Sequence, residues 1–144
     1  SRLAAAGAEA LVRALDDLGP GTPQDHTRAT FAPKVEKSEG LITFEETATD
    51  IYNRFRAFDP WPGVFVMSGG EALKLTDIAP VAAAGAPVDA SALPGTILEI
   101  GDDVIVACGE GALRVRELQR PGKPRTSAGA VARGLGWRAG DKLP

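Results

Sequence analysis

The residues with the clearest chemical potential in this sequence are the basic side chains of its last quarter. Residues 111–144 contain 8 Lys and Arg against 2 Asp and Glu, a net charge of +6, whereas residues 1–110 contain 8 against 17, a net charge of −9. Because salt screens distant charges, a polyanion is attracted by this local patch and is little affected by the total charge of −3. The segment therefore predicts a polyanionic partner such as a nucleic acid, with a solvated, solubilising surface as the alternative.

Two groups of cations in this segment are placed to bind phosphates. Arg114 and Arg116 alternate along a predicted strand, so we expect their side chains on one face about 6.6 Å apart, able to bind successive phosphates. Three further cations follow on the Pro- and Gly-containing loop 120–125, whose prolines limit the entropy lost on binding. Trp137 is the only aromatic residue of the segment, which favours backbone recognition over base stacking.

No set of side chains has the composition of a catalytic or metal site. His26 is the only histidine and lies in the predicted linker. A metal site with two histidines and a Ser-His-Asp arrangement therefore lack the residues that they require. The G-x-G-x-x-A pattern at 134–139 follows no strand, so we interpret it as chance. The adjacent carboxylates at 45–46 and 102–103 fit solvated turns better than acids facing across a cleft. The single cysteine, Cys108, excludes a disulfide framework and is interpreted as a small buried side chain.

A helix near the middle of the chain closes on a Pro-Trp-Pro corner. Its predicted range is 48–58, and the preceding Thr-Ala-Thr-Asp resembles a capping box. Ile51, Phe55 and Phe58 recur at helical spacing and share one apolar face. Trp61, held between two prolines, is interpreted as a core anchor.

Two further helices and a linker are expected. Residues 2–18 form an amphipathic helix with leucines on one face. Residues 22–39 show no helical or strand periodicity in their apolar residues and are predicted to form a linker or a strap. A closing helix over 127–134 is capped by Ser127, and residues 136–144 look like a tail.

The remaining elements are short β runs separated by turn-forming glycines. Five are counted: Val64–Ser68, Ala72–Ile78, Thr96–Ile100, Val104–Cys108 and Leu113–Gln119. Their short connections predict antiparallel hairpins, and residues 79–93 predict an irregular excursion. The fold class is therefore mainly β: an OB-like five-stranded antiparallel Greek-key barrel with one or two short helices, with a β-sandwich as the main rival.

Length and composition fit one ordinary domain. A chain of 144 residues with 44% hydrophobic residues can bury a core. It contains no apolar run near 18 residues, and its alanine-rich start lacks the features of a signal peptide. We expect a cytoplasmic protein with no membrane partner. We expect a monomer, or a weak artefactual dimer formed through the leucine face at residues 11, 15 and 18.

Four strings along the chain resemble the C-terminal part of the methionyl-tRNA formyltransferase family, which formylates initiator methionyl-tRNA for bacterial translation initiation. The strings are TFAPKVEKSE at 30–39, RAFDPWP at 56–62, PGTI at 94–97 and LQRPGK at 118–123. The resemblance implies a helix left over from a catalytic domain at 1–24, an interdomain linker at 25–44 and an OB-like domain at 45–144.

The resemblance also implies a role in holding tRNA. The residues expected to contact initiator methionyl-tRNA are Arg114, Arg116, Arg120, Lys123 and Arg125, with Lys34, Lys37 and Arg54 as helpers. The family's active site lies in an N-terminal Rossmann-like domain that this chain lacks, so we expect the chain to be inactive alone and to hold no cofactor. The substrate 10-formyltetrahydrofolate belongs to the parent enzyme. The alternative is the same module in a formyltransferase for sugar nucleotides or folates, which does not bind RNA.

Overall fold

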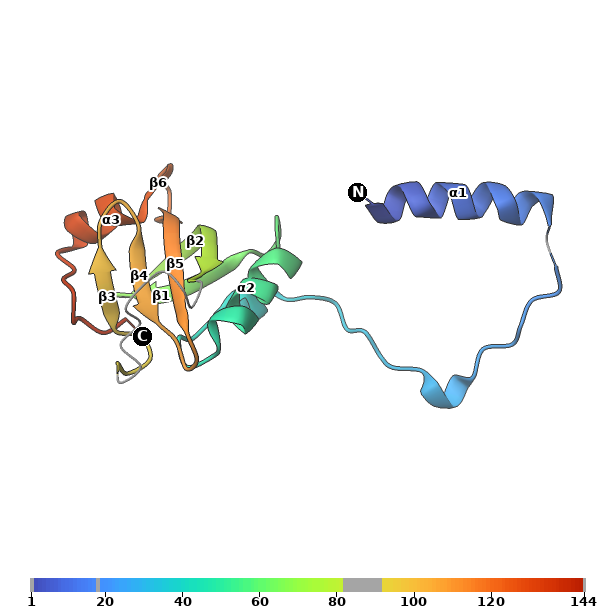
Figure 1. The fold of residues 1–144 in the computed structure, drawn as a ribbon, viewed down its shortest axis with the longest axis horizontal. Coiled ribbons are helices and arrows are strands. Elements are labelled where there is room, and N and C mark those ends of the chain that lie inside the picture. Colours follow the sequence, from blue (N-terminus) through green and yellow to red (C-terminus); the bar gives the residue numbers. More distant parts are fainter. Residues whose placement is uncertain (1, 18, 82–91, 144) are drawn as a thin grey trace. The chain divides into compact units, whose positions relative to one another are not determined.

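The computed structural model divides the chain into two compact units, Ser1–Pro33 and Lys34–Pro144 (Figure 1). It describes residues 2–17, 19–81 and 92–143. The first unit contains helix α1 (Arg2–Asp16) and the 3₁₀ turn η1 (His26–Arg28), and none of the described residues of α1 is buried. The division at 33/34 falls inside the stretch predicted as a linker.

The second unit is built on one antiparallel sheet. Its strands are β1 (Val64–Ser68), β2 (Glu71–Pro80), β3 (Ile97–Ile100), β4 (Val104–Ala107), β5 (Ala112–Gln119) and β6 (Arg125–Ser127). Their order is β1-β2-β5-β4-β3, and β6 pairs with β5 (Figure 1). Within the described residues β1 and β3 do not pair, so the sheet is not closed.

The prediction of a mainly antiparallel β domain with short helices is confirmed, but closure into a barrel and the number of strands were wrong. The first five strands coincide with the predicted runs to within a few residues. The sixth, β6, has three residues, too few to show an alternating pattern, and it exists because the turn after β5 returns the chain alongside it. The predicted excursion at 79–93 begins later than expected, since β2 continues to Pro80, and residues 82–91 lie outside the described residues.

Two glycine turns set the register of the sheet. Gly69 and Gly70 have φ of 57° and 83°, as a two-residue type I′ hairpin requires, and they pair Phe65 with Lys74. Pro121 and Gly122 join β5 to β6. Gly122 has φ of 67°, and the Lys123 N–H donates to the Arg120 carbonyl over 3.1 Å, as in a type II turn.

Helix α2 (Ala48–Ala57) packs on β2, as its apolar face predicts. Thr47 caps it, its Oγ1 accepting from the Asp50 N–H over 3.0 Å. Ile51 is fully buried, and Phe55 and Phe58 pack against the core.

The interpretation of Trp61 as a core anchor was wrong. Trp61 is 59% exposed, whereas Phe55 and Phe58 are the aromatic residues of this corner that pack against the core. The peptide bonds before Pro60 and Pro62 are both cis.

The C-terminal segment packs more closely than predicted. Helix α3 (Ala128–Leu135) is capped by Ser127 and buries Val131, which confirms the expected closing helix. The residues after it are not a tail. The Leu143 N–H donates to the Gly95 carbonyl over 2.8 Å, the Ile97 N–H donates to the Asp141 carbonyl, and Leu143 is buried. Backbone pairing with the start of β3 holds this aperiodic segment. Figure 1 shows α2 and α3 at opposite ends of the sheet.

Cys108 lies in the core and is expected to be unreactive. The side chain is 6% exposed, and burial raises the pKa of its thiol to about 12. A thiol ionising that high stays protonated at pH 8, and the thiolate is the reactive form. We expect native protein at pH 8 to react with a disulfide reagent at least about 100-fold more slowly than denatured protein. Equal rates would show that the thiol is accessible.

Among the described helices, none combines the length and apolar character that crossing a membrane requires.

Candidate nucleic-acid interface

A row of four paired residues crosses the outward face of the sheet. Phe65 on β1 pairs with Lys74 on β2, Lys74 with Gln119 on β5, and Gln119 with Arg125 on β6. Residues paired directly across neighbouring strands project from the same face. The strand neighbours of Lys74, Leu73 and Leu75, are buried on the opposite face. We call these four residues the cross-strand row.

The turn after β5 continues the row with more cations. The Gln119 side-chain Nε2 donates to the Lys123 carbonyl over 3.0 Å, which ties the turn to the row. Lys123 and Arg125 are exposed, and Arg125 and Lys74 line the same small hollow of about 40 Å³. A cation from the middle of the sheet and a cation from the edge strand therefore lie around one surface depression.

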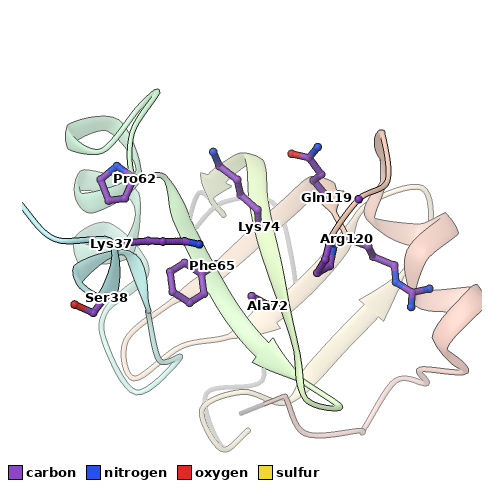
Figure 2. A pocket seen from close by; sticks show the side chains of 10 residues that line it. Lys37, Ser38, Pro62, Phe65, Ala72, Lys74, Gln119 and Arg120 are labelled. Carbon is purple, nitrogen blue, oxygen red and sulfur yellow. The ribbon is translucent and has the colours of Figure 1, made fainter.

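A larger groove of about 470 Å³ lies on the other side of Lys74. Its lining includes Lys37, Pro62, Phe65, Lys74, Arg120 and Pro121. Figure 2 shows the Lys37 side chain extending over Phe65 and the Lys74 side chain extending upward, away from the Phe65 ring, whereas the guanidinium of Arg120 points away from the groove. The end of the Lys74 side chain lies beside Gly63. Lys37 belongs to the 3₁₀ turn η2 (Lys37–Gly40), which begins three residues into the second unit.

Four of the predicted tRNA-binding arginines are engaged with carboxylates. Arg54 pairs with Glu46 at 2.6 Å, Arg114 with Asp103 at 3.0 Å, Arg116 with Asp77 at 3.1 Å, and Arg120 with Glu71 through two nitrogens at 3.0 to 3.1 Å. Asp77 and Glu71 lie on β2, 39 and 49 residues from their arginines, so no local pattern reveals these two pairs, whereas Glu46 and Asp103 lie 8 and 11 residues from theirs. Partly exposed pairs of this kind contribute about 0–1 kcal/mol each, so a phosphate can replace the carboxylate.

Arg114 and Arg116 do flank the buried Val115 on β5, but their ion pairs separate them. The partner of Arg114, Asp103, precedes β4, and the partner of Arg116, Asp77, lies on β2. These strands lie on either side of β5. The two guanidinium groups therefore lean toward opposite neighbours.

The remaining predicted cations, Lys34, Lys37, Lys123 and Arg125, are exposed and form no ion pair with any described residue. Lys74 is half-buried and likewise forms no ion pair with any described residue, and the sequence analysis missed it. The signal was present: Lys74 sits between two buried leucines on β2, and the Gly-Gly hairpin places it opposite Phe65. Four cations around the row and groove, Lys37, Lys74, Lys123 and Arg125, therefore form no ion pair with any described residue.

The described residues contain no cluster of His, Cys, Asp or Glu able to hold a metal ion. His26 is exposed on η1. Of the carboxylates singled out in the sequence, those of Glu46 and Asp103 form ion pairs with Arg54 and Arg114. The arrangement can bind and orient a polyanion.

Comparison with known proteins relates the second unit to one family. Residues 34–136 match the family described as "Formyl transferase, C-terminal domain". Methionyl-tRNA formyltransferases are among the similar curated proteins. That of Granulibacter bethesdensis is 42% identical over 98% of this chain and 43% of its own length. That of Burkholderia vietnamiensis is 42% identical over 99% of this chain and 44% of its own length. That of Campylobacter curvus is 41% identical over 94% of this chain and 42% of its own length. The chain thus spans less than half the length of these relatives.

Among solved structures, HypX from Aquifex aeolicus has a similar fold. A variant of it matches with a TM-score of 0.58 at 19% identity, covering 88% of this chain and 23% of that chain. HypX in complex with tetrahydrofolic acid matches with a TM-score of 0.56 at 20% identity, covering 94% and 26%. At this identity the likeness concerns the fold alone.

Proposed function

The chain belongs to the formyl transferase C-terminal domain family and corresponds to the C-terminal part of methionyl-tRNA formyltransferases, and from this premise we propose that it holds initiator methionyl-tRNA for N-formylation in translation initiation. In this proposal an N-terminal Rossmann-like domain of the same enzyme, with 10-formyltetrahydrofolate as its formyl donor, carries out the transfer. The present chain contributes binding and orientation and no reacting group.

The observation that carries the proposal is the cluster of unpaired cations around the cross-strand row. Lys37, Lys74, Lys123 and Arg125 come from a 3₁₀ turn, a central strand, a tight turn and an edge strand, and all lie beside the groove or the turn that adjoins it. Ammonium and guanidinium groups on a rigid sheet bind phosphates with little loss of conformational entropy. An OB-like use of this sheet face and its loops for nucleic acid is part of the proposal.

The paired arginines have a secondary role in this proposal. Arg114, Arg116, Arg120 and Arg54 exchange their carboxylates for phosphates when RNA is bound, and Lys34 contacts RNA near the start of the unit. Phosphate contacts set the position and orientation of the RNA and carry no direct sequence information. Discrimination of the initiator tRNA is therefore assigned to the catalytic domain.

Salt dependence tests the proposal. With about four phosphates neutralised, the logarithm of the association constant for a bacterial initiator tRNA should fall with log salt at a slope of about −3 to −4. Fluorescence anisotropy with labelled tRNA between about 50 and 200 mM salt measures this slope. Binding that does not respond to salt, or no binding at low salt, would contradict the proposal and favour a formyltransferase module that does not meet RNA.

A further inference from the structure

We infer that the groove beside Phe65 takes one unpaired nucleotide of the bound RNA, with its base against the Phe65 ring and its phosphate between Lys37 and Lys74. This inference rests on the proposed function and adds a site to it.

The size and floor of the groove fit a planar ring. Its volume of about 470 Å³ lies within the range of small-molecule sites, about 300–1,000 Å³. Phe65 is half-buried on β1, so its ring is supported by the strand while one side remains open to the groove. Pro62 and Pro121 come from opposite borders, a cis-proline corner and a tight turn, and both are stiff. An aromatic floor between stiff walls is suited to stacking a base.

The charge of the groove selects an anion. Lys37, Lys74 and Arg120 contribute to its lining, and no described carboxylate does. Arg120 is held by Glu71, which leaves the two lysines to meet the ligand. In Figure 2 the ammonium group of Lys37 lies next to Phe65, and that of Lys74 lies above it, on the far side of Lys37 from the ring. A ligand with an aromatic ring next to a negative group matches this arrangement, and a nucleotide has that chemistry.

Gln119 supplies a polar group at the far side of the groove. Its Nε2 is held by the Lys123 carbonyl, which fixes the orientation of the amide, and its Oε1 accepts no hydrogen bond from any described residue. The oxygen is thus available to an exocyclic amine of a base. The basic quarter of the sequence contains a single aromatic residue, which disfavoured base stacking. Phe65 lies outside that quarter and is brought next to the cations by strand pairing.

The test compares two RNA hairpins that differ at one bulged position, which carries either a nucleotide with its base or an abasic residue with the same phosphate. The full chain should bind the hairpin with the base about tenfold more tightly, as expected for stacking on one aromatic ring. Phe65→Ala should abolish this preference and leave binding of the abasic hairpin unchanged. Lys74→Gln should weaken binding of both hairpins. AMP should compete better than inorganic phosphate or an acidic peptide of equal charge.

Met67→Ala is the matched control, since Met67 lies two residues along β1, is 40% exposed and does not line the groove. It should retain the preference, and thermal unfolding should show that each variant is folded. Equal binding of both hairpins, with no effect of Phe65→Ala, would overturn the nucleotide site and leave the proposed function standing. Absence of binding to either hairpin would overturn both. Equal competition by the acidic peptide would show that the groove recognises charge without a base.

Discussion

Reversing the charge of Lys74 and Arg125 together is expected to weaken binding of initiator tRNA about 100-fold at low salt. Both side chains belong to the cross-strand row and line one hollow, whose lining also includes Asp59. Neither forms an ion pair with a described residue, so each can contact a phosphate. A hydrogen bond to a charged group contributes about 1.5 kcal/mol, which is about tenfold in affinity for each residue. The salt slope should become shallower by about 2. Anisotropy titrations of Lys74→Glu with Arg125→Glu measure both quantities.

A matched pair of reversals separates local contact from total charge. Arg138→Glu with Lys142→Glu changes the net charge by the same amount, but Lys142 bridges to Thr96 at the start of β3, at the other end of the strand order. This variant should lose no more than about threefold, through long-range attraction alone. If the two double variants lose affinity equally, the row is not the binding surface.

Replacing Gly129 with alanine is expected to destabilise the second unit by about 3 kcal/mol and to lower its Tm by about 15 °C. A Cβ at this position would lie 1.9 Å from the Gly101 carbonyl oxygen and 2.9 Å from that of Asp102, both backbone atoms. The Gly129 N–H also donates to the Asp102 carbonyl over 2.8 Å, so relieving the clash breaks this bond. Calorimetry or thermal circular dichroism measures the change.

Gly134 in the same helix provides the opposite result. Apart from its chain neighbours and the backbone of its own helix, no described atom lies within 4 Å of the position that a Cβ at Gly134 would take, so alanine there gains helix propensity without a clash. We expect Gly134→Ala to stabilise the protein by about 0.5–1 kcal/mol. A Gly129→Ala variant as stable as wild type would show that α3 is not held against the turn before β4 as closely as the structure indicates.

Much of the local structure could be predicted from the sequence because its signals are local. Alternation and turn glycines locate β1 to β5, and the side chains of Thr47 and Ser127 mark the starts of α2 and α3. Pairing over long distance is not encoded in this way. The sixth strand, the backbone bonds of Leu143 and the open edge of the sheet all depend on contacts between distant segments.

The candidate site was predictable in part for the same reason. The basic quarter identified Lys123 and Arg125, which are exposed and unpaired among the described residues. It did not reveal that Arg116 and Arg120 meet Asp77 and Glu71, 39 and 49 residues away, because those pairs follow from strand register and from the irregular pairing of β2 with β5. The alternation of buried residues along β2 marks Lys74 as outward-facing, but Lys74 lies outside the basic last quarter of the chain.

The arginine ion pairs have a consequence for selectivity. The charges of Arg114, Arg116 and Arg120 are already neutralised by carboxylates of the same domain. A short or sparsely charged polyanion that reaches one of them gains little, since it must displace a resident counter-charge of comparable strength. A long, regularly spaced phosphate backbone displaces several at once. In the proposed function, internal competition of this kind sets a threshold that favours an extended partner with many phosphates over brief encounters with unrelated acidic molecules.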